Sequence, residues 1–157
     1  MIPFDPTEIA RLAERLLSGE MSVEDFTGRM CQPSIADLGE VQVDLDRSRR
    51  CGFPEVIYAQ DKPVETIETI VRAMVEHGID VLATRLSAEK ATVLLAKFPL
   101  GRYNAVGRTF RLPLPQPPRP CGKVAIVTAG TSDLPVAEEA RETALWMGAE
   151  VVTVQDV

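Results

Sequence analysis

A short turn of small and polar residues near the end of the sequence has the composition of an anion-binding site. The apolar run at residues 124–127 leads into Gly130, Thr131, Ser132 and Asp133, and a helical pattern follows. The first backbone N–H groups of a helix lack partners and carry a partial positive charge. The two hydroxyls add donors at the same point, so the pattern favours a phosphate or carboxylate ligand in this 130–133 turn.

Asp133 leaves several interpretations of the turn open, because a carboxylate repels an anion. It could cap the helix, accept hydrogen bonds from ribose hydroxyls, or coordinate a metal beside the phosphate. The turn could equally be structural, with Ser132 or Asp133 as the N-cap and Gly130 as the corner. The residues match neither GxGxxG nor the P-loop pattern, so spacing alone does not separate a ligand site from a capped corner.

A second candidate site lies in the segment RRCGFPE at residues 49–55. Arginine guanidinium groups suit phosphate and carboxylate, and a substrate could lie between Glu55 and Lys62. Arg50, Glu55 and Lys62 are therefore candidate substrate contacts. The alternative is a pair of solvated arginines before a rigid Gly-Phe-Pro turn.

Composition restricts the classes of function. The chain has 157 residues, 45% hydrophobic and 25% charged, with a net charge of −6, which argues against a nucleic acid partner. It shows no membrane-length apolar run and no signal-peptide pattern, which predicts a cytoplasmic protein with no membrane partner. The widely spaced Cys31, Cys51 and Cys121 and a single histidine predict no metal site, and the cysteines are expected to be buried.

The spacing of apolar residues changes along the chain between the repeat of a helix and that of a strand. These changes predict the helices and strands that position the candidate residues, and together they predict an α/β fold. Residues 1–40 form a helical N-terminal segment with two amphipathic helices, and residues 41–110 alternate strand and helix in a small α/β domain that ends in one extended segment at 104–112. Residues 111–120 hold five prolines and form a linker. Residues 121–157 form the first β-α-β unit of a doubly wound parallel sheet.

That last unit places the 130–133 turn at the carboxyl end of a strand, where open α/β sheets bind ligands. The unit has 37 residues, below the roughly 40 that sustain a core alone. We therefore expect the sheet to continue beyond Val157 in a longer protein.

Two motifs in a fixed order carry a family resemblance. The segment AIVTAGTSDLPVAEEA resembles the opening of the phosphoribosylaminoimidazole carboxylase (PurE-like) domain, whose first strand ends in a loop that holds the substrate's ribose phosphate. Together with RCGFPEVIYAQDKP and the proline-rich linker, it is similar to the LarB family of nickel-pincer cofactor biosynthesis, with a PurE-like domain after a small α/β domain.

The resemblance implies a carboxylase and hydrolase. Such an enzyme carboxylates the pyridinium ring of nicotinic acid adenine dinucleotide and hydrolyses its phosphoanhydride, which gives pyridinium-3,5-biscarboxylic acid mononucleotide and AMP. Gly130, Thr131, Ser132 and Asp133 would hold the nicotinate-ribose phosphate, and the family's catalytic cysteine would lie beyond Val157. The resemblance also implies carbon dioxide or bicarbonate as co-substrate, no tightly bound cofactor and a homo-oligomer of eight subunits. It leaves open whether the enzyme requires magnesium.

Three other functions remain at this point. The chain could be a nucleotide- or phosphate-binding regulatory module, or an enzyme of purine biosynthesis like aminoimidazole ribonucleotide carboxylase. It could also be a structural assembly domain in which the amphipathic residues 7–30 build an oligomer and the turn is empty.

Overall fold

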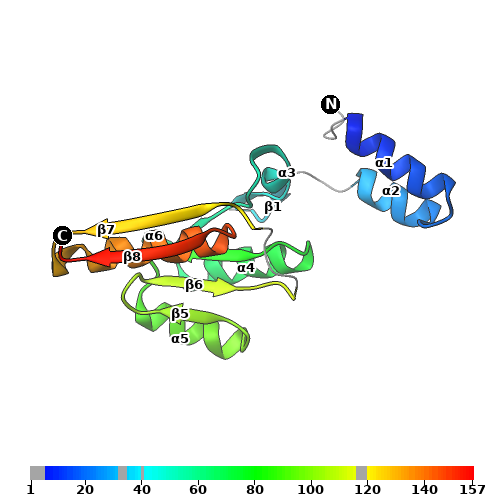
Figure 1. Cartoon of the computed structure of the whole chain (residues 1–157). Helices are drawn as coiled ribbons and strands as arrows, with labels where there is room; N and C mark the ends of the chain where they lie inside the picture. The colour runs from blue at the N-terminus through cyan, green and yellow to red at the C-terminus, as the bar shows by residue number, and fades with distance from the viewer. Residues whose placement is uncertain (1–5, 32–34, 40, 116–119) are drawn as a thin grey trace. The chain divides into compact units, whose positions relative to one another are not determined.

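The structure is a computed structural model that describes residues 6–31, 35–39, 41–115 and 120–157 (Figure 1). The chain divides into two compact units, Met1–Ile35 and Ala36–Val157. It is a mixed α/β protein, as the sequence predicted.

The first unit is a helical hairpin. Helix α1 (Pro6–Leu17) is followed by helix α2 (Val23–Cys31), and the side chain of Leu12 is 1% exposed between them. Ser22 Oγ accepts a hydrogen bond from the backbone N–H of Asp25 at 3.0 Å, which satisfies one free donor of the first turn of α2. The two helices predicted for the N-terminal segment are therefore confirmed.

The second unit begins with extended chain. Strand β1 (Ile35–Asp37) pairs with strand β2 (Gln42–Asp44), and a short helix, α3 (Arg47–Cys51), follows. The Asp37 carboxylate accepts from the N–H of Gly39, whose φ of 88° closes a tight turn. The prediction of a helical segment up to residue 40 is therefore wrong for its last residues, which form β1 and the turn between β1 and β2.

A four-stranded mixed sheet forms the centre of the second unit, in the order β3-β4-β6-β5. Its strands are β3 (Ile57–Tyr58), β4 (Val81–Thr84), β5 (Arg102–Asn104) and β6 (Thr109–Leu112). Strands β3 and β4 are parallel, whereas β6 is antiparallel to both β4 and β5. The small α/β domain is confirmed, with one difference in its last strands.

That difference is a hairpin where one extended segment was expected at residues 104–112. Asn104 Oδ1 accepts the N–H groups of Val106 and Gly107, each at 3.0 Å, and Arg108 takes a positive φ of 52°. These bonds reverse the chain between β5 and β6. Strand β6 then runs to Leu112, two residues into the predicted linker, of which residues 116–119 lie outside the described part.

Helices α4 (Val64–Glu76) and α5 (Ala88–Lys97) pack on the four-stranded sheet around a core that includes Phe110. Ser87 caps helix α5, because its Oγ accepts from the N–H of Lys90 at 3.4 Å. His77 ends α4, with Nδ1 2.7 Å from the carbonyl oxygen of Ala73.

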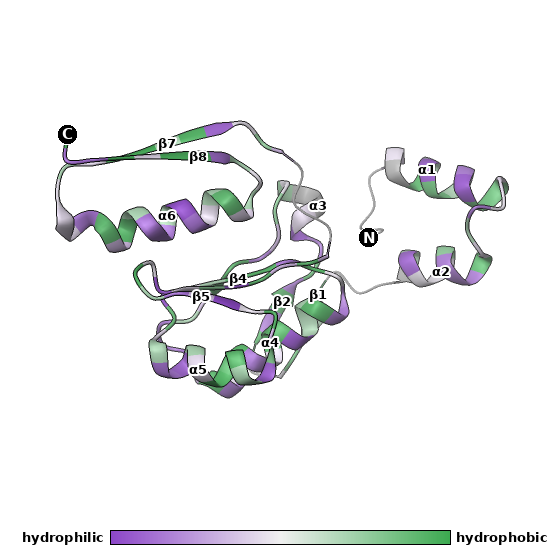
Figure 2. Ribbon diagram, turned by 60° about the horizontal axis from the view of Figure 1, so that its bottom comes forward, coloured by the Kyte–Doolittle hydropathy of each residue, from purple (hydrophilic) through white to green (hydrophobic). Residues whose placement is uncertain are grey.

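The last part of the chain is the predicted β-α-β unit. Strands β7 (Lys123–Thr128) and β8 (Glu150–Gln155) are parallel, and helix α6 (Leu134–Trp146) connects them. Figures 1 and 2 show α6 between this strand pair and the four-stranded sheet, with α4 and α5 on the sheet's other side. Figure 2 also shows hydrophobic residues along β7 and β8, where Val127 and Val152 lie on one face and are 58% and 57% exposed.

Candidate functional site

The 130–133 turn connects the carboxyl end of β7 to the start of α6. A single 3-10 turn, Thr131–Asp133, leads into α6, which has a proline in its first turn. Gly130 is extended, with φ −152° and ψ 162°, and a Cβ built on it would meet only Ser132 Oγ, at 3.9 Å. The backbone therefore does not require glycine here. The missing side chain leaves open space beside the turn.

The side chains of Thr131, Ser132 and Asp133 are exposed. Asp133 occupies the N-cap position of α6 but makes no side-chain cap hydrogen bond, and within the described part of the chain none of these three side chains has a hydrogen-bond or ion-pair partner. The interpretation of Ser132 or Asp133 as a capping side chain is therefore wrong. Two hydroxyls and one carboxylate remain free to bind a ligand, the hydroxyls as donors to an oxyanion and Asp133 as an acceptor.

The same edge of the strand pair carries two residues that the sequence analysis missed. The parallel register pairs Thr128 with Gln155, so Gln155 and Asp156 lie at the edge where the 130–133 turn begins. The N–H of Val157 donates to the carbonyl oxygen of Thr128 at 3.5 Å, which holds this end of the chain against β7. The rule that ligands bind at the carboxyl ends of parallel strands would have found both residues if applied to the second strand.

The candidate contacts Arg50, Glu55 and Lys62 are not brought together at this turn. Arg50 belongs to α3, and its side chain lies outside the described part. Glu55 precedes β3 and Lys62 follows it, so the two half-buried residues lie at opposite ends of that strand. Among the described residues, no hydrogen bond or ion pair joins Glu55 or Lys62 to the 130–133 turn, and their role in substrate binding stays a prediction.

The loop that carries Lys62 is held by a lysine that sequence reasoning did not single out. Lys90 Nζ donates to three backbone carbonyl oxygens of the loop, those of Ala59 at 3.1 Å, Gln60 at 3.0 Å and Lys62 at 2.8 Å. These bonds use all three donors of an ammonium group. Helix α5 thereby fixes the loop at the carboxyl end of β3.

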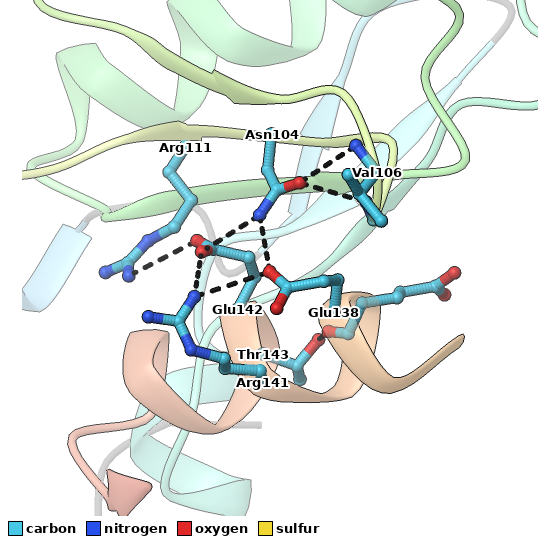
Figure 3. Close-up of polar contacts among 9 residues, drawn as sticks. Asn104, Val106, Arg111, Glu138, Arg141, Glu142 and Thr143 are labelled. Carbon is cyan, nitrogen blue, oxygen red and sulfur yellow. Dashed lines mark hydrogen bonds and ion pairs between the residues drawn. The ribbon is translucent and has the colours of Figure 1, made fainter. Parts of the chain in front are cut away.

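Helix α6 is attached to the β5–β6 hairpin by a cluster of polar side chains, shown in Figure 3. Asn104 Nδ2 donates to Glu138 Oε2 at 2.8 Å and to Glu142 Oε1 at 3.4 Å. Arg141 bridges the same two carboxylates, with its terminal nitrogen 3.4 Å from Glu138 and 3.3 Å from Glu142. Asn104 therefore both shapes the hairpin turn and binds the helix.

The hairpin also approaches the helix backbone at Gly107. A Cβ built there would lie 2.9 Å from both the carbonyl carbon of Glu138 and the amide nitrogen of Glu139. Beside this contact, Arg85 Nε lies 2.6 Å from Glu139 Oε2. The absence of a side chain at Gly107 is thus what lets the hairpin dock on α6, the helix that starts at the 130–133 turn.

Three buried polar atoms lie near the other end of α6. Asp80 Oδ1, Arg111 Nε and Trp146 Nε1 are buried without a hydrogen-bond partner among the described residues. Burial raises the pKa of the Asp80 carboxyl above its ordinary value, while the charge of Arg111 and the neighbouring Trp146 indole act in the opposite direction. Trp146 is 3% exposed and belongs to the buried residues of the second unit.

The cysteines differ from the expectation of burial. Cys51 and Cys121 are free and exposed. Cys51 ends the short helix α3, before the left-handed Gly52, and Cys121 precedes β7 in exposed chain, so neither position has a core to enter. The side chain of Cys31 lies outside the described residues.

In the described residues no group of three or more histidine, cysteine, aspartate or glutamate side chains is placed to hold a metal ion. None of the described helices is long and apolar enough to cross a membrane.

The chain is similar to known proteins both in its small α/β domain and over most of its length. Residues 35–113 match the family model of the LarB/PurE-like N-terminal domain. The chain is also 33% identical over 147 residues to an uncharacterised protein of Methanocaldococcus jannaschii, a match that covers 89% of this chain and 57% of that protein. The chain therefore spans little more than half the length of the curated relative it matches.

Proposed function

Since this chain belongs to the LarB/PurE-like family, we propose that it is the N-terminal part of an enzyme that carboxylates the pyridinium ring of nicotinic acid adenine dinucleotide. The same enzyme hydrolyses the phosphoanhydride of the dinucleotide and releases AMP, in the synthesis of a nickel-pincer cofactor. In this proposal the 130–133 turn holds the phosphate and ribose of the nicotinate half.

The observation that carries the proposal is the open, unpaired state of the 130–133 turn. The hydroxyls of Thr131 and Ser132 are exposed and have no partner among the described residues. Gly130 leaves room for a phosphate oxygen to approach the backbone where the helical segment begins. In this proposal Asp133 accepts hydrogen bonds from the ribose hydroxyls and does not contact the phosphate.

The chemistry requires a nucleophile in addition to this anchor. A pyridinium ring is electron-poor, and it attacks carbon dioxide only after a nucleophile has added to it and produced an enamine-like ring. Cys51 lies in α3, and Cys121 lies at the amino end of β7, opposite the turn. We therefore propose that another part of the enzyme supplies the thiolate to the ring, and that this chain binds and orients the substrate.

Gly130→Ala tests the anchor without disturbing the fold. Alanine accepts the extended backbone at this position and makes only an ordinary 3.9 Å contact, but its Cβ occupies the space beside the turn. We expect unchanged thermal stability and a loss of at least about tenfold in affinity for nicotinic acid mononucleotide, measured by calorimetry. Gly28→Ala in α2, where a Cβ meets nothing within 4 Å, is the matched control and should leave the affinity unchanged.

Equal affinity of Gly130→Ala and the parent chain for the mononucleotide would contradict the phosphate assignment. A regulatory module would also lose ligand in this variant, so the second measurement is product formation by the full-length enzyme. Release of AMP from the dinucleotide, lost in the variant, supports the carboxylase and hydrolase. Turnover of aminoimidazole ribonucleotide instead would assign the purine pathway.

The remaining proposals rest on the same family. We propose carbon dioxide or bicarbonate as the co-substrate, a cytoplasmic homo-oligomer of eight subunits as the working form, and no tightly bound cofactor. Sedimentation of the full-length enzyme tests the assembly, and a titration with magnesium tests whether the ion contributes to binding at Asp133.

A further inference from the structure

We propose a second anion site, in a cavity between the β5–β6 hairpin and α6, for a small ligand that carries a phosphate or carboxylate on a partly apolar body. The cavity has a volume of about 470 Å³, within the usual range for small-molecule sites. Three arginines line it, Arg102 of β5, Arg111 of β6 and Arg141 of α6, while Pro113 and Leu145 supply apolar wall.

The first argument is the arrangement of like charges. Arg102 and Arg111 are directly opposite each other in the antiparallel β5–β6 pair, so both side chains lie on the same face of the sheet. Like charges at such positions destabilise a strand pair. Their juxtaposition in a chain with a net charge of −6 therefore indicates a use for concentrated positive charge at this point.

The second argument is the unused donors of this arginine pair. In the part of the chain that the structure describes, Arg102 has no ion pair and no side-chain hydrogen bond. Arg111 Nε is buried and unpaired, and a terminal nitrogen of Arg111 lies 4.0 Å from Glu142 Oε2. One oxyanion between the two guanidinium groups would pair these donors and remove the repulsion.

The acidic groups around the cavity are committed to other partners. Glu138 and Glu142 both lie within 3.4 Å of Arg141, and each accepts a hydrogen bond from Asn104. Asp80 contributes an attraction to Arg111 from the buried side. These carboxylates contact or attract Arg141 and Arg111, so Arg102 is the cavity arginine that has no ion-pair partner among the described residues.

This site is separate from the 130–133 turn and does not rest on the proposed function. Arg141 lies seven residues after the first residue of α6, which is about 10 Å along a helix axis. The apolar wall at Pro113 and Leu145 predicts that a nucleoside monophosphate binds more tightly than inorganic phosphate, because the base and sugar bury apolar surface against it.

The test uses Arg102→Gln, a substitution at an exposed side chain, with Arg11→Gln in α1 as a control that removes the same charge from another exposed position. Inorganic phosphate and AMP are titrated into each protein by calorimetry. We expect Arg102→Gln to lose at least about tenfold in AMP affinity and Arg11→Gln to match the parent chain. Without ligand, Arg102→Gln should unfold at a higher urea concentration, because one like charge has been removed.

The same titrations with Ser132→Ala/Asp133→Ala distinguish the two sites. Loss of AMP affinity in Arg102→Gln, retained in the turn variant, supports the arginine site regardless of what the turn binds. Binding that is lost only in the turn variant overturns this proposal and leaves the proposed function intact. An Arg102→Gln protein that binds AMP as tightly as the parent, or a parent that binds neither probe at millimolar concentration, also overturns it.

Discussion

Gly107→Ala measures whether the hairpin and α6 are docked in solution. The added Cβ would lie 2.9 Å from two backbone atoms of the helix and 3.2 Å from Glu138 Cβ, so the helix or the hairpin has to move. Overpacking of this kind costs about 1–3 kcal/mol. Alanine also lowers the entropy of the unfolded chain, which offsets about 0.4–1 kcal/mol of that cost. The midpoints of the two ranges leave an expected net loss of stability of about 1.3 kcal/mol.

The assay is thermal unfolding followed by circular dichroism, with amide hydrogen exchange of α6 as the local readout. A loss of that size lowers Tm by about 3–6 °C for a chain of this length. Amides of α6 should exchange faster, because the helix loses its contact with the hairpin. Gly130→Ala is the control, since the same change there meets nothing closer than 3.9 Å and should leave Tm unchanged or slightly higher.

An unchanged or raised Tm for Gly107→Ala, with exchange of α6 amides equal to the parent, would refute the reasoning. That result would mean that the close approach of Gly107 to Glu138 and Glu139 is absent in solution. The Asn104 hydrogen bonds to α6 would then have to be abandoned as well, because they depend on the same approach.

Three further predictions concern charged side chains. Burial raises the folded pKa of Asp80 above its ordinary 3.8, so the stabilisation from its protonation is present at lower pH and lost as the pH rises through the raised value. Asp80→Asn should therefore raise Tm at neutral pH and flatten the Tm profile between the ordinary and the raised pKa. Hydrogen bonds from Lys97 and Arg72 lower the pKa of Glu68 below its ordinary 4.5, so its contribution is present above that value and lost on acidification. Glu68→Gln should accordingly lower Tm at neutral pH and match the parent in acid. Lys90→Met leaves three carbonyl oxygens without their donor and should cost about 1–3 kcal/mol in urea unfolding; a midpoint equal to the parent's would show that water replaces the ammonium without loss.

The helices and the β-α-β unit could be predicted because their signals are local. Apolar residues recur at helical spacing through α4, and Ser87 supplies a recognisable cap for α5. The hairpin at residues 104–108 was missed for a local reason too. The turn has no Asn-Gly or Asp-Gly pair, and the reversal depends on the Asn104 side chain and on the left-handed backbone of Arg108, an uncommon conformation for arginine.

The residues of the two candidate sites also differ in whether a local sequence pattern reveals them. The residues of the 130–133 turn could be located from the sequence because a strand, a small-residue turn and a helix follow one another directly. The arginine pair could not be predicted from the sequence. Arg102 and Arg111 lie opposite each other only because of the β5–β6 register, and the hydrophobic pattern of the sequence did not reveal that hairpin. Docking of α6 on that hairpin depends on side chains more than thirty positions apart, with no local pattern to announce it.

The ammonium of Lys90 occupies the position in which a monovalent cation would complete a ring of carbonyl oxygens. Because this cation is covalently attached to α5, its effective concentration at the loop of residues 59–62 does not depend on the ionic composition of the solution. Its three N–H donors all point at carbonyl oxygens of the loop, so none is left for an acceptor outside it. The loop is therefore held by a cation that is part of the chain, which neither ion exchange nor a chelator can remove.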